Sequence, residues 1–429
     1  MIQRLIDFLN ASPVNFLAVK TLKEELEKAG FQNLDPSEPL DGLKPGSQFY
    51  VTKNDSSLYA FRLGNEPLQE GGFHIICAHC DSPTYRIKPN AEITSEGMVR
   101  LNTEVYGGPI MSTWFDRPLS LAGRVILHTE DPMHPETRLL HVKRPLLQIS
   151  NLAIHFNRQV NDGVRLSKQK DMLPILGIVE NELEKGNLLI KIITDELGIK
   201  ASDILDFDLY LYDVTPACTF GVHNEFISSG RLDDLSMVFA GLEALLKAGD
   251  GIPKHTQVLA IFDNEETGSQ TKQGAGSPFL SSILKRIVLA QGGKLEDYYR
   301  SVEQAFMVSA DNAHAWHPNY NEKYDPTNHP VLGGGPVIKY NAAQKYASDA
   351  VSGAIFANIC ETAGVPCQRF VNHSDVAGGS TLGNILAGSL PLRGVDMGNP
   401  ILAMHSARET GAVRDHEYCV RAFTRFYQL

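Results

Sequence analysis

Five segments of the 429-residue chain place Asp, Glu or His where predicted strands end or a predicted helix begins. They read His79-Cys80-Asp81, Arg231-Leu232-Asp233-Asp234, Asp263-Asn264-Glu265-Glu266, Ser309-Ala310-Asp311 and Met404-His405-Ser406. In open α/β sheets, ligands bind beyond the carboxyl ends of the strands, so these side chains are expected to converge. Asp, Glu and His together form the donor set that a metal ion requires.

Taken singly, each acid has a structural explanation, because an Asp or Glu after a strand is usually a cap or turn residue. The adjacent pair Glu265 and Glu266 is harder to explain in this way. Two neighbouring carboxylates repel one another unless a cation or water satisfies them. Residues two apart on a strand point to the same side, so Asp81 is placed to orient a metal-bound His79.

The donor set fits two zinc ions, with Co²⁺ or Mn²⁺ as possible substitutes. Asp233 would bridge both ions, His79 and Asp311 would complete one, and Glu266 and His405 the other. Three protein ligands per ion, with a position left for a shared water, is the composition of a catalytic zinc site. Glu265 would then act as general base on a water whose pKa zinc lowers toward about 7.

Short apolar runs and helices alternate along the parts of the chain that carry these residues. The runs 73–79, 257–263, 305–311 and 390–395 are typical of buried, largely parallel strands, and residues 2–30, 234–248 and 277–290 have helical periodicity. This alternation predicts a layered α/β domain.

Residues 90–224 have a different sequence pattern, with β-like segments at 121–128, 139–147 and 208–212 separated by Pro and Gly. We interpret them as a strand-rich domain inserted into an α/β catalytic domain made of residues 1–89 and 225–429.

The net charge of −11 argues against nucleic acid or an anionic membrane surface as a partner, because an acidic exterior repels phosphate. Charged residues between Met1 and Asp7 interrupt any apolar stretch of a signal peptide, and no later segment has the length of a membrane span. Six cysteines in so long a chain do not indicate a disulfide scaffold. We therefore expect a cytoplasmic protein with reduced cysteines.

The other sequence patterns that could mark a functional site do not support one. Cys77 and Cys80 have C-x-x-C spacing without a second such pair, which favours core packing over a zinc ribbon. Gly333-Gly334-Gly335 precedes a predicted strand and lacks the Lys of a phosphate loop, so it predicts a turn. No Gly-x-Ser-x-Gly elbow of a serine hydrolase occurs.

Taken together and in order, the motifs of this chain resemble the aspartyl aminopeptidase family of dizinc exopeptidases. The resemblance rests on Ala78-His79-Cys80-Asp81-Ser82-Pro83, Tyr106-Gly107-Gly108, Thr113-Trp114-Phe115-Asp116-Arg117, Arg231-Leu232-Asp233, Asp263-Asn264-Glu265-Glu266-Thr267-Gly268-Ser269, Ser309-Ala310-Asp311-Asn312-Ala313-His314-Ala315 and Met404-His405-Ser406. Cys80, where the family often has threonine, and Asp234, where asparagine is common, depart from the pattern.

The resemblance implies a zinc aminopeptidase that prefers acidic N-terminal residues, with an oligomerisation domain inserted into its catalytic domain and a tetrahedral dodecamer as its assembly. It implies the same metal ligands, Glu265 as catalytic base and Asp81 as orienting residue. It adds three substrate contacts: Lys339, which would meet an acidic side chain, His314 near the site, and His155 delivered from a neighbouring subunit. A related dizinc amidohydrolase or carboxypeptidase, and a catalytically silent oligomeric scaffold, are the alternatives.

Overall fold

The chain folds into two compact units in the computed structural model, which describes residues 1–179, 187–249 and 251–429. The first unit comprises Met1–Asp81, Ala217–Met404 and Glu409–Leu429, and the second comprises Ser82–Pro216 and His405–Arg408. The chain therefore leaves the first unit and returns to it after the second. The predicted insert with its bounds at 90 and 224 stays a prediction. The assignment of the second unit to oligomerisation stays a prediction.

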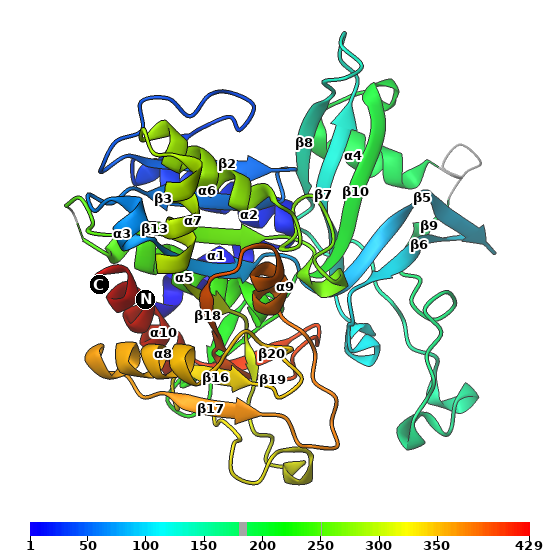
Figure 1. Cartoon of the computed structure of the whole chain (residues 1–429). Coiled ribbons are helices and arrows are strands. Elements are labelled where there is room, and N and C mark those ends of the chain that lie inside the picture. The colour runs from blue at the N-terminus through cyan, green and yellow to red at the C-terminus, as the bar shows by residue number, and fades with distance from the viewer. Residues whose placement is uncertain (180–186, 250) are drawn as a thin grey trace. The chain divides into compact units, whose positions relative to one another are not determined.

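The first unit is built on a large mixed sheet whose nine described strands follow the order β1-β2-β3-β13-β4-β14-β18-β16-β17 (Figure 1). In sequence order they are β1 (Gln32–Asn33), β2 (Gln48–Lys53), β3 (Ser57–Arg62), β4 (Phe73–His79), β13 (Thr256–Phe262), β14 (Phe306–Ala310), β16 (Val337–Tyr340), β17 (Gln368–Val371) and β18 (Arg393–Gly398). The central strands β13, β4, β14 and β18 run parallel. Their carboxyl ends therefore meet at one edge, as the apolar runs predict.

Helices cover both faces of this sheet. Alternate residues of β4 divide between two cores, with Ile76 and Ala78 in the first and Ile75 and Cys77 in the second. The first core includes residues of α1 (Ile2–Ala11), α2 (Asn15–Lys28), α5 (Leu232–Lys247), α8 (Ala350–Thr362) and α10 (Val413–Tyr427), and the second includes residues of α3 (Leu68–Gly71), α6 (Phe279–Ala290), α7 (Leu295–Gln304) and α9 (Leu382–Ser389). Because both faces are covered, the central strands are buried along nearly their whole length.

A smaller sheet of the first unit extends from the segments that carry the predicted ligands. Its described strands are β11 (Cys218–Phe220), β12 (Phe226–Ser229), β20 (Glu409–Ala412), β19 (Pro400–Leu402) and β15 (Ala313–His314), in that spatial order. β15 begins two residues after Asp311 and pairs in parallel with β19. The position of His314 is thus fixed by main-chain pairing close to the edge where the large sheet ends.

The second unit contains an antiparallel sheet whose six described strands follow the order β8-β7-β10-β5-β6-β9. These are β5 (Thr84–Ser95), β6 (Met98–Tyr106), β7 (Leu119–Leu127), β8 (Glu136–His141), β9 (Ile175–Ile178) and β10 (Ile204–Asp213), with α4 (Leu188–Leu197) beside them. The strand expected over 139–147 is wrong in extent, because β8 ends at His141 and Pro145 interrupts the segment that follows.

The fold class is confirmed: an α/β unit is combined with a strand-rich one. Two helices separated near Pro13 are present, as the periodicity of residues 2–30 predicts. Among the described residues, no helix has both the length and the apolar character that crossing a membrane demands. All six cysteines are free thiols, and Cys77 and Cys80 are buried, as core packing requires.

We predict that His416 makes the first unit sensitive to acid. This residue of α10 is buried against Phe239, and its ring nitrogens make no hydrogen bond within the described residues. Burial, with the charge of Lys247, lowers the pKa of His416 to about 3. The unfolded chain, with a His pKa of about 6.5, therefore takes up the proton first, and stability falls as the pH drops below that value.

His416→Leu should reduce the loss of unfolding free energy between pH 7 and pH 5 by about 2 kcal/mol, measured by urea denaturation at both pH values. The exposed His223 provides the control His223→Gln, for which no change is expected. An unaltered pH dependence in His416→Leu would contradict the assignment.

Candidate active site

His79 stands at the end of β4 with its two ring nitrogens facing different partners. Nδ1 lies 3.1 Å from the Asp81 carbonyl oxygen and 3.4 Å from the Asp81 carboxylate. Nε2 lies 3.5 Å from Oδ1 of Asp233 and 3.9 Å from Oε2 of Glu265. Because the Asp81 carbonyl oxygen accepts a hydrogen bond from Nδ1–H, it fixes the ring so that Nε2 faces the acids, as a metal ligand requires.

Asp81 also holds the two adjacent glutamates. Its carboxylate oxygens accept the backbone N–H groups of Glu265 and Glu266, each at 3.1 Å. The glutamates open the short 3₁₀ helix η6 (Glu265–Thr267), which follows β13. One buried carboxylate therefore links the predicted ligand on β4 to the predicted base and ligand after β13.

The first turn of α5 contributes Asp233 and Asp234, which are joined by a cis peptide bond. The Asp233 N–H donates to Oε2 of Glu409 at 3.0 Å. Asp234 accepts the backbone N–H groups of His79 at 3.2 Å and of Asn312 at 3.3 Å. Asp234 thus connects three of the converging segments, since Asn312 directly follows Asp311.

The side chains of the first unit that we predict to bind metal lie together in the structure. His79, Asp233, Asp234 and Asp311 each offer a ligand atom within 4.8 Å of the others, and His79, Glu265 and Glu266 form a second such group. His405 falls in the stretch His405–Arg408 of the second unit, where its Nδ1 lies 3.1 Å from the Gly108 carbonyl oxygen. Its role as a ligand stays a prediction.

Burial and mutual repulsion raise the pKa values of these acids. Burial, aided by Asp311 and Asp81 and opposed by His79, raises the pKa of Glu265 to about 8. The pKa of Glu266 lies well above its ordinary value because of burial and the charge of Asp233. Burial likewise raises the pKa of Asp311, although Lys339 opposes the shift. A divalent cation would relieve this repulsion, and the donors are those that zinc accepts, so the residues fit a metal centre.

Three buried polar residues that support the site were not predicted from the sequence. Asp234 and Glu409 hold backbone groups of the ligand segments, and the Asn312 side chain donates to the Leu232 carbonyl oxygen at 2.8 Å. Asp234 and Asn312 adjoin predicted ligands in the sequence, which is the only signal that could have marked them. Glu409 carries no such signal.

The three predicted substrate contacts lie in different environments. Lys339 on β16 is buried, with Nζ 3.5 Å from Oδ1 of Asp311 and donating to the Asn312 carbonyl oxygen at 3.3 Å. His314 is exposed, and its ring contacts Phe370. His155 lies on η2 (Ile154–Phe156) of the second unit and is exposed. The Lys339 ammonium is therefore already engaged with a predicted metal ligand.

An α/β sheet whose strands end in a buried cluster of His and acidic residues defines this protein as a metal-dependent hydrolase by class. The family model "Aminopeptidase I zinc metalloprotease (M18)" matches residues 8–427. The chain belongs to this M18 family of zinc aminopeptidases, which confirms the resemblance and the enzyme class. A silent scaffold and a carboxypeptidase are thereby less well supported than the aminopeptidase.

Relatives match over nearly the whole chain. It is 52% identical over 428 residues to a probable M18 family aminopeptidase 2 of Clostridium acetobutylicum, covering 100% of this chain and 98% of the relative. The corresponding protein of Clostridium novyi is 50% identical over 426 residues, covering 99% and 98%.

Solved structures are also similar. A chain of the cryo-EM structure of the Ape4 and Nbr1 complex has a TM-score of 0.95 at 38% identity, covering 99% of this chain and 85% of that one. A chain of the Saccharomyces cerevisiae mApe1 dodecamer has a TM-score of 0.87 at 26% identity, covering 99% and 96%.

We predict that Lys339 stabilises the metal-free site. Lys339→Met keeps the length of the side chain but leaves Asp311 among other acids without its cation. The unfolding free energy of chelator-treated protein should fall by about 3 kcal/mol, and that of zinc-loaded protein by clearly less, because zinc supplies the missing positive charge. Urea denaturation of both forms measures this difference.

Lys345→Met serves as a matched control, because Lys345 donates to the Gly378 carbonyl oxygen and forms no ion pair with a carboxylate within the described residues. Equal losses in the two forms of Lys339→Met would show that Lys339 does not compensate the acids.

Proposed function

We propose that this aminopeptidase hydrolyses the first peptide bond of its substrates with two zinc ions per subunit and Glu265 as general base. The observation that carries the proposal is the placement of Glu265. Its carboxylate lies 3.9 Å from His79 Nε2, its backbone is held by Asp81, and it adjoins the predicted ligand Glu266. A base beside the metal ligands is the arrangement that hydrolysis of a peptide bond requires.

His79, Asp233 and Asp311 would hold one zinc ion, and Asp233, Glu266 and His405 the other. When bound, zinc would polarise the scissile carbonyl and make water more acidic. Glu265 would take the proton from the attacking water and return it to the nitrogen of the leaving peptide. Asp81 would hold the His79 ring and the Glu265 backbone in place during the reaction, because it contacts both.

A preference for acidic N-terminal residues is the substrate class that we assign. Lys339 is the buried cation nearest to the ligand Asp311 among the described contacts, and His314 lies three residues after that ligand. An ammonium in a desolvated site favours a carboxylate partner more strongly than one in water. Once zinc neutralises Asp311, the Lys339 ammonium would pair with the carboxylate of the substrate side chain.

We further propose that the protein works as a homo-oligomer, a tetrahedral dodecamer, in the cytoplasm. Support comes from the dodecameric state of the mApe1 relative. Leu152, Ile154 and Phe156 of the second unit are 59%, 51% and 81% exposed, and we take this exposed apolar segment to be part of the interface. His155 lies between Ile154 and Phe156, so an interface here would deliver it to a neighbouring subunit. A monomer in light scattering would contradict this assembly.

Glu265→Gln should reduce kcat about 10²- to 10⁴-fold while leaving the zinc content unchanged, because the amide cannot accept a proton but fills the same space. Hydrolysis of an aminoacyl peptide and elemental analysis of the purified protein check both parts. Glu266→Gln is the matched comparison, and it should lose zinc. Full activity of Glu265→Gln would remove this residue as the base.

Lys339→Met should lower kcat/KM for peptides that begin with Asp or Glu at least about tenfold more than for peptides that begin with Ala, since it removes the charge partner of the acidic side chain. The measurement is kcat/KM of the variant and the parent enzyme for a set of peptides that differ only in their N-terminal residue. Equal losses on acidic and neutral substrates would confine Lys339 to the support of Asp311.

A further inference from the structure

A cavity of about 250 Å³ in the first unit adjoins the ligand segments, and of the residues that line it only His314 has a part in the function proposed above. We call it the basic cavity, and it is lined by the polar residues His314, His317, Lys323, Tyr324, Asn372 and His373, together with apolar residues of 401–404. His314 follows Asp311 by three positions, and Met404 directly precedes His405. The volume is enough for one side chain or one chain end of a peptide, and not for a large ligand.

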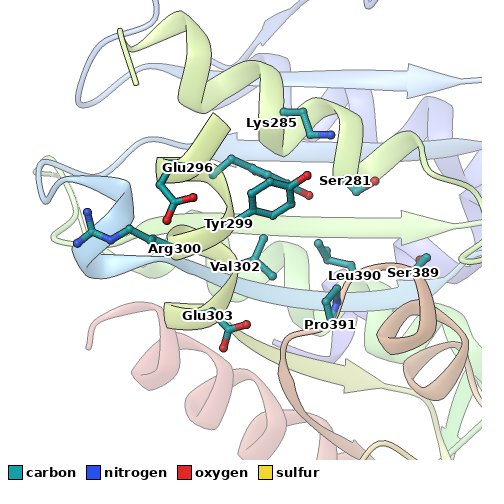
Figure 2. Close-up of a pocket in the computed structure, with 11 residues that line it drawn as sticks. Ser281, Lys285, Glu296, Tyr299, Arg300, Val302, Glu303, Ser389, Leu390 and Pro391 are labelled. Carbon is teal, nitrogen blue, oxygen red and sulfur yellow. The ribbon is translucent and has the colours of Figure 1, made fainter. Parts of the chain in front are cut away.

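The basic cavity differs in charge from another cavity of this unit. Lys323 and three histidines line it, and no carboxylate does so within the described residues. The cavity in Figure 2 has both signs, with Glu296 and Glu303 beside Lys285 and Arg300. Asp375, with its side chain 93% exposed, stands 3.9 Å from His373 Nδ1 but does not line the cavity, whereas Lys323 lines it and is also exposed. The lining therefore favours an anion.

Hydrogen bonds prepare two of the histidines to act as donors. Nδ1 of His317 accepts the backbone N–H of Asn319, and Nδ1 of His373 accepts that of Asp375, each at 3.2 Å. A ring nitrogen that accepts carries no proton, so the neutral ring keeps its proton on Nε2 and can donate it. Asn372 adds an amide oxygen that is buried and makes no hydrogen bond within the described chain, which a peptide N–H would satisfy.

The basic cavity is distinct from the position of Lys339. Lys339 and Phe370 are direct cross-strand partners on β16 and β17, so their side chains lie on the same face of the sheet. Phe370 lines the cavity and contacts the His314 ring, whereas the Lys339 ammonium contacts Asp311 and the ring of Tyr346. Lys339 and the basic cavity with its Lys323 are thus two separate cationic positions.

We propose that the basic cavity binds a substrate carboxylate on the leaving side of the scissile bond. This carboxylate would be either the side chain of the second residue or the free C-terminus of a short peptide. The inference rests on the proposed function, in which Lys339 binds the carboxylate of the N-terminal side chain. The basic cavity is then left for a carboxylate on the part of the substrate that leaves after cleavage. The enzyme would accordingly bind acidic dipeptides and peptides with Asp or Glu in second place better than their neutral counterparts.

Binding to the zinc-loaded full chain carrying Glu265→Gln tests this separately from catalysis. Isothermal titration calorimetry would compare Asp-Ala-Ala-amide with Asp-Asp-Ala-amide for the second side chain, and Asp-Ala-amide with Asp-Ala for the free C-terminus. Ala-Ala-Ala-amide against Asp-Ala-Ala-amide reports the first residue. Lys323→Gln and His373→Gln are added singly, and Lys285→Gln, in the cavity of Figure 2, is the control.

At least one leaving-side carboxylate should tighten binding about fivefold or more, and Lys323→Gln and His373→Gln should each reduce that gain while Lys285→Gln preserves it. Equal affinity for charged and neutral leaving sides in the parent protein would overturn the proposal. So would variants that change only the Asp-over-Ala preference at the first residue, because the cavity would then hold the N-terminal side chain. Failure of the proposed function would instead be seen as absent cleavage by protein with intact Glu265, and the calorimetric comparison would be unaffected.

Discussion

Mutual repulsion among buried acids is the constraint on which the rest of this structure depends. Asp233, Asp234, Asp311 and Glu266 lie with His79 at one edge of the sheet, and burial raises the pKa values of Asp234, Asp311 and Glu266. Such a cluster is costly in an apolar interior unless positive charge enters it. The metal-free fold provides His79 and the adjacent Lys339, and the zinc expected of this family would provide the remainder.

Main-chain hydrogen bonds hold the cluster together despite this repulsion. Asp81 binds the backbone of both glutamates, Asp234 binds that of His79 and Asn312, and Glu409 binds that of Asp233. These three acids, none of which is a predicted ligand, thus accept hydrogen bonds from backbone N–H groups of the segments that carry ligands. Hydrogen bonds within the fold therefore fix the backbone of the segments that carry the predicted ligands.

The sequence predicted the parts of the site that follow from local pattern. Apolar runs located β4, β13 and β14, and the residues after them are the ones that converge. It did not predict Asp234, Asn312 and Glu409 as supports, because their partners are backbone groups distant in sequence, and no periodicity encodes them. It also gave no indication that Lys339 would be buried against Asp311, since that contact depends on the pairing of β16 with its neighbours.

The central claim is that the acidic cluster is a two-zinc centre on which hydrolysis depends. The most direct measurement is the zinc content of the purified chain by elemental analysis, followed through chelation and titration with zinc while peptide cleavage is recorded. The account predicts two zinc ions per chain at full activity, loss of cleavage on chelation, and recovery as zinc returns. Undiminished cleavage by protein that contains no zinc or other divalent metal would contradict it.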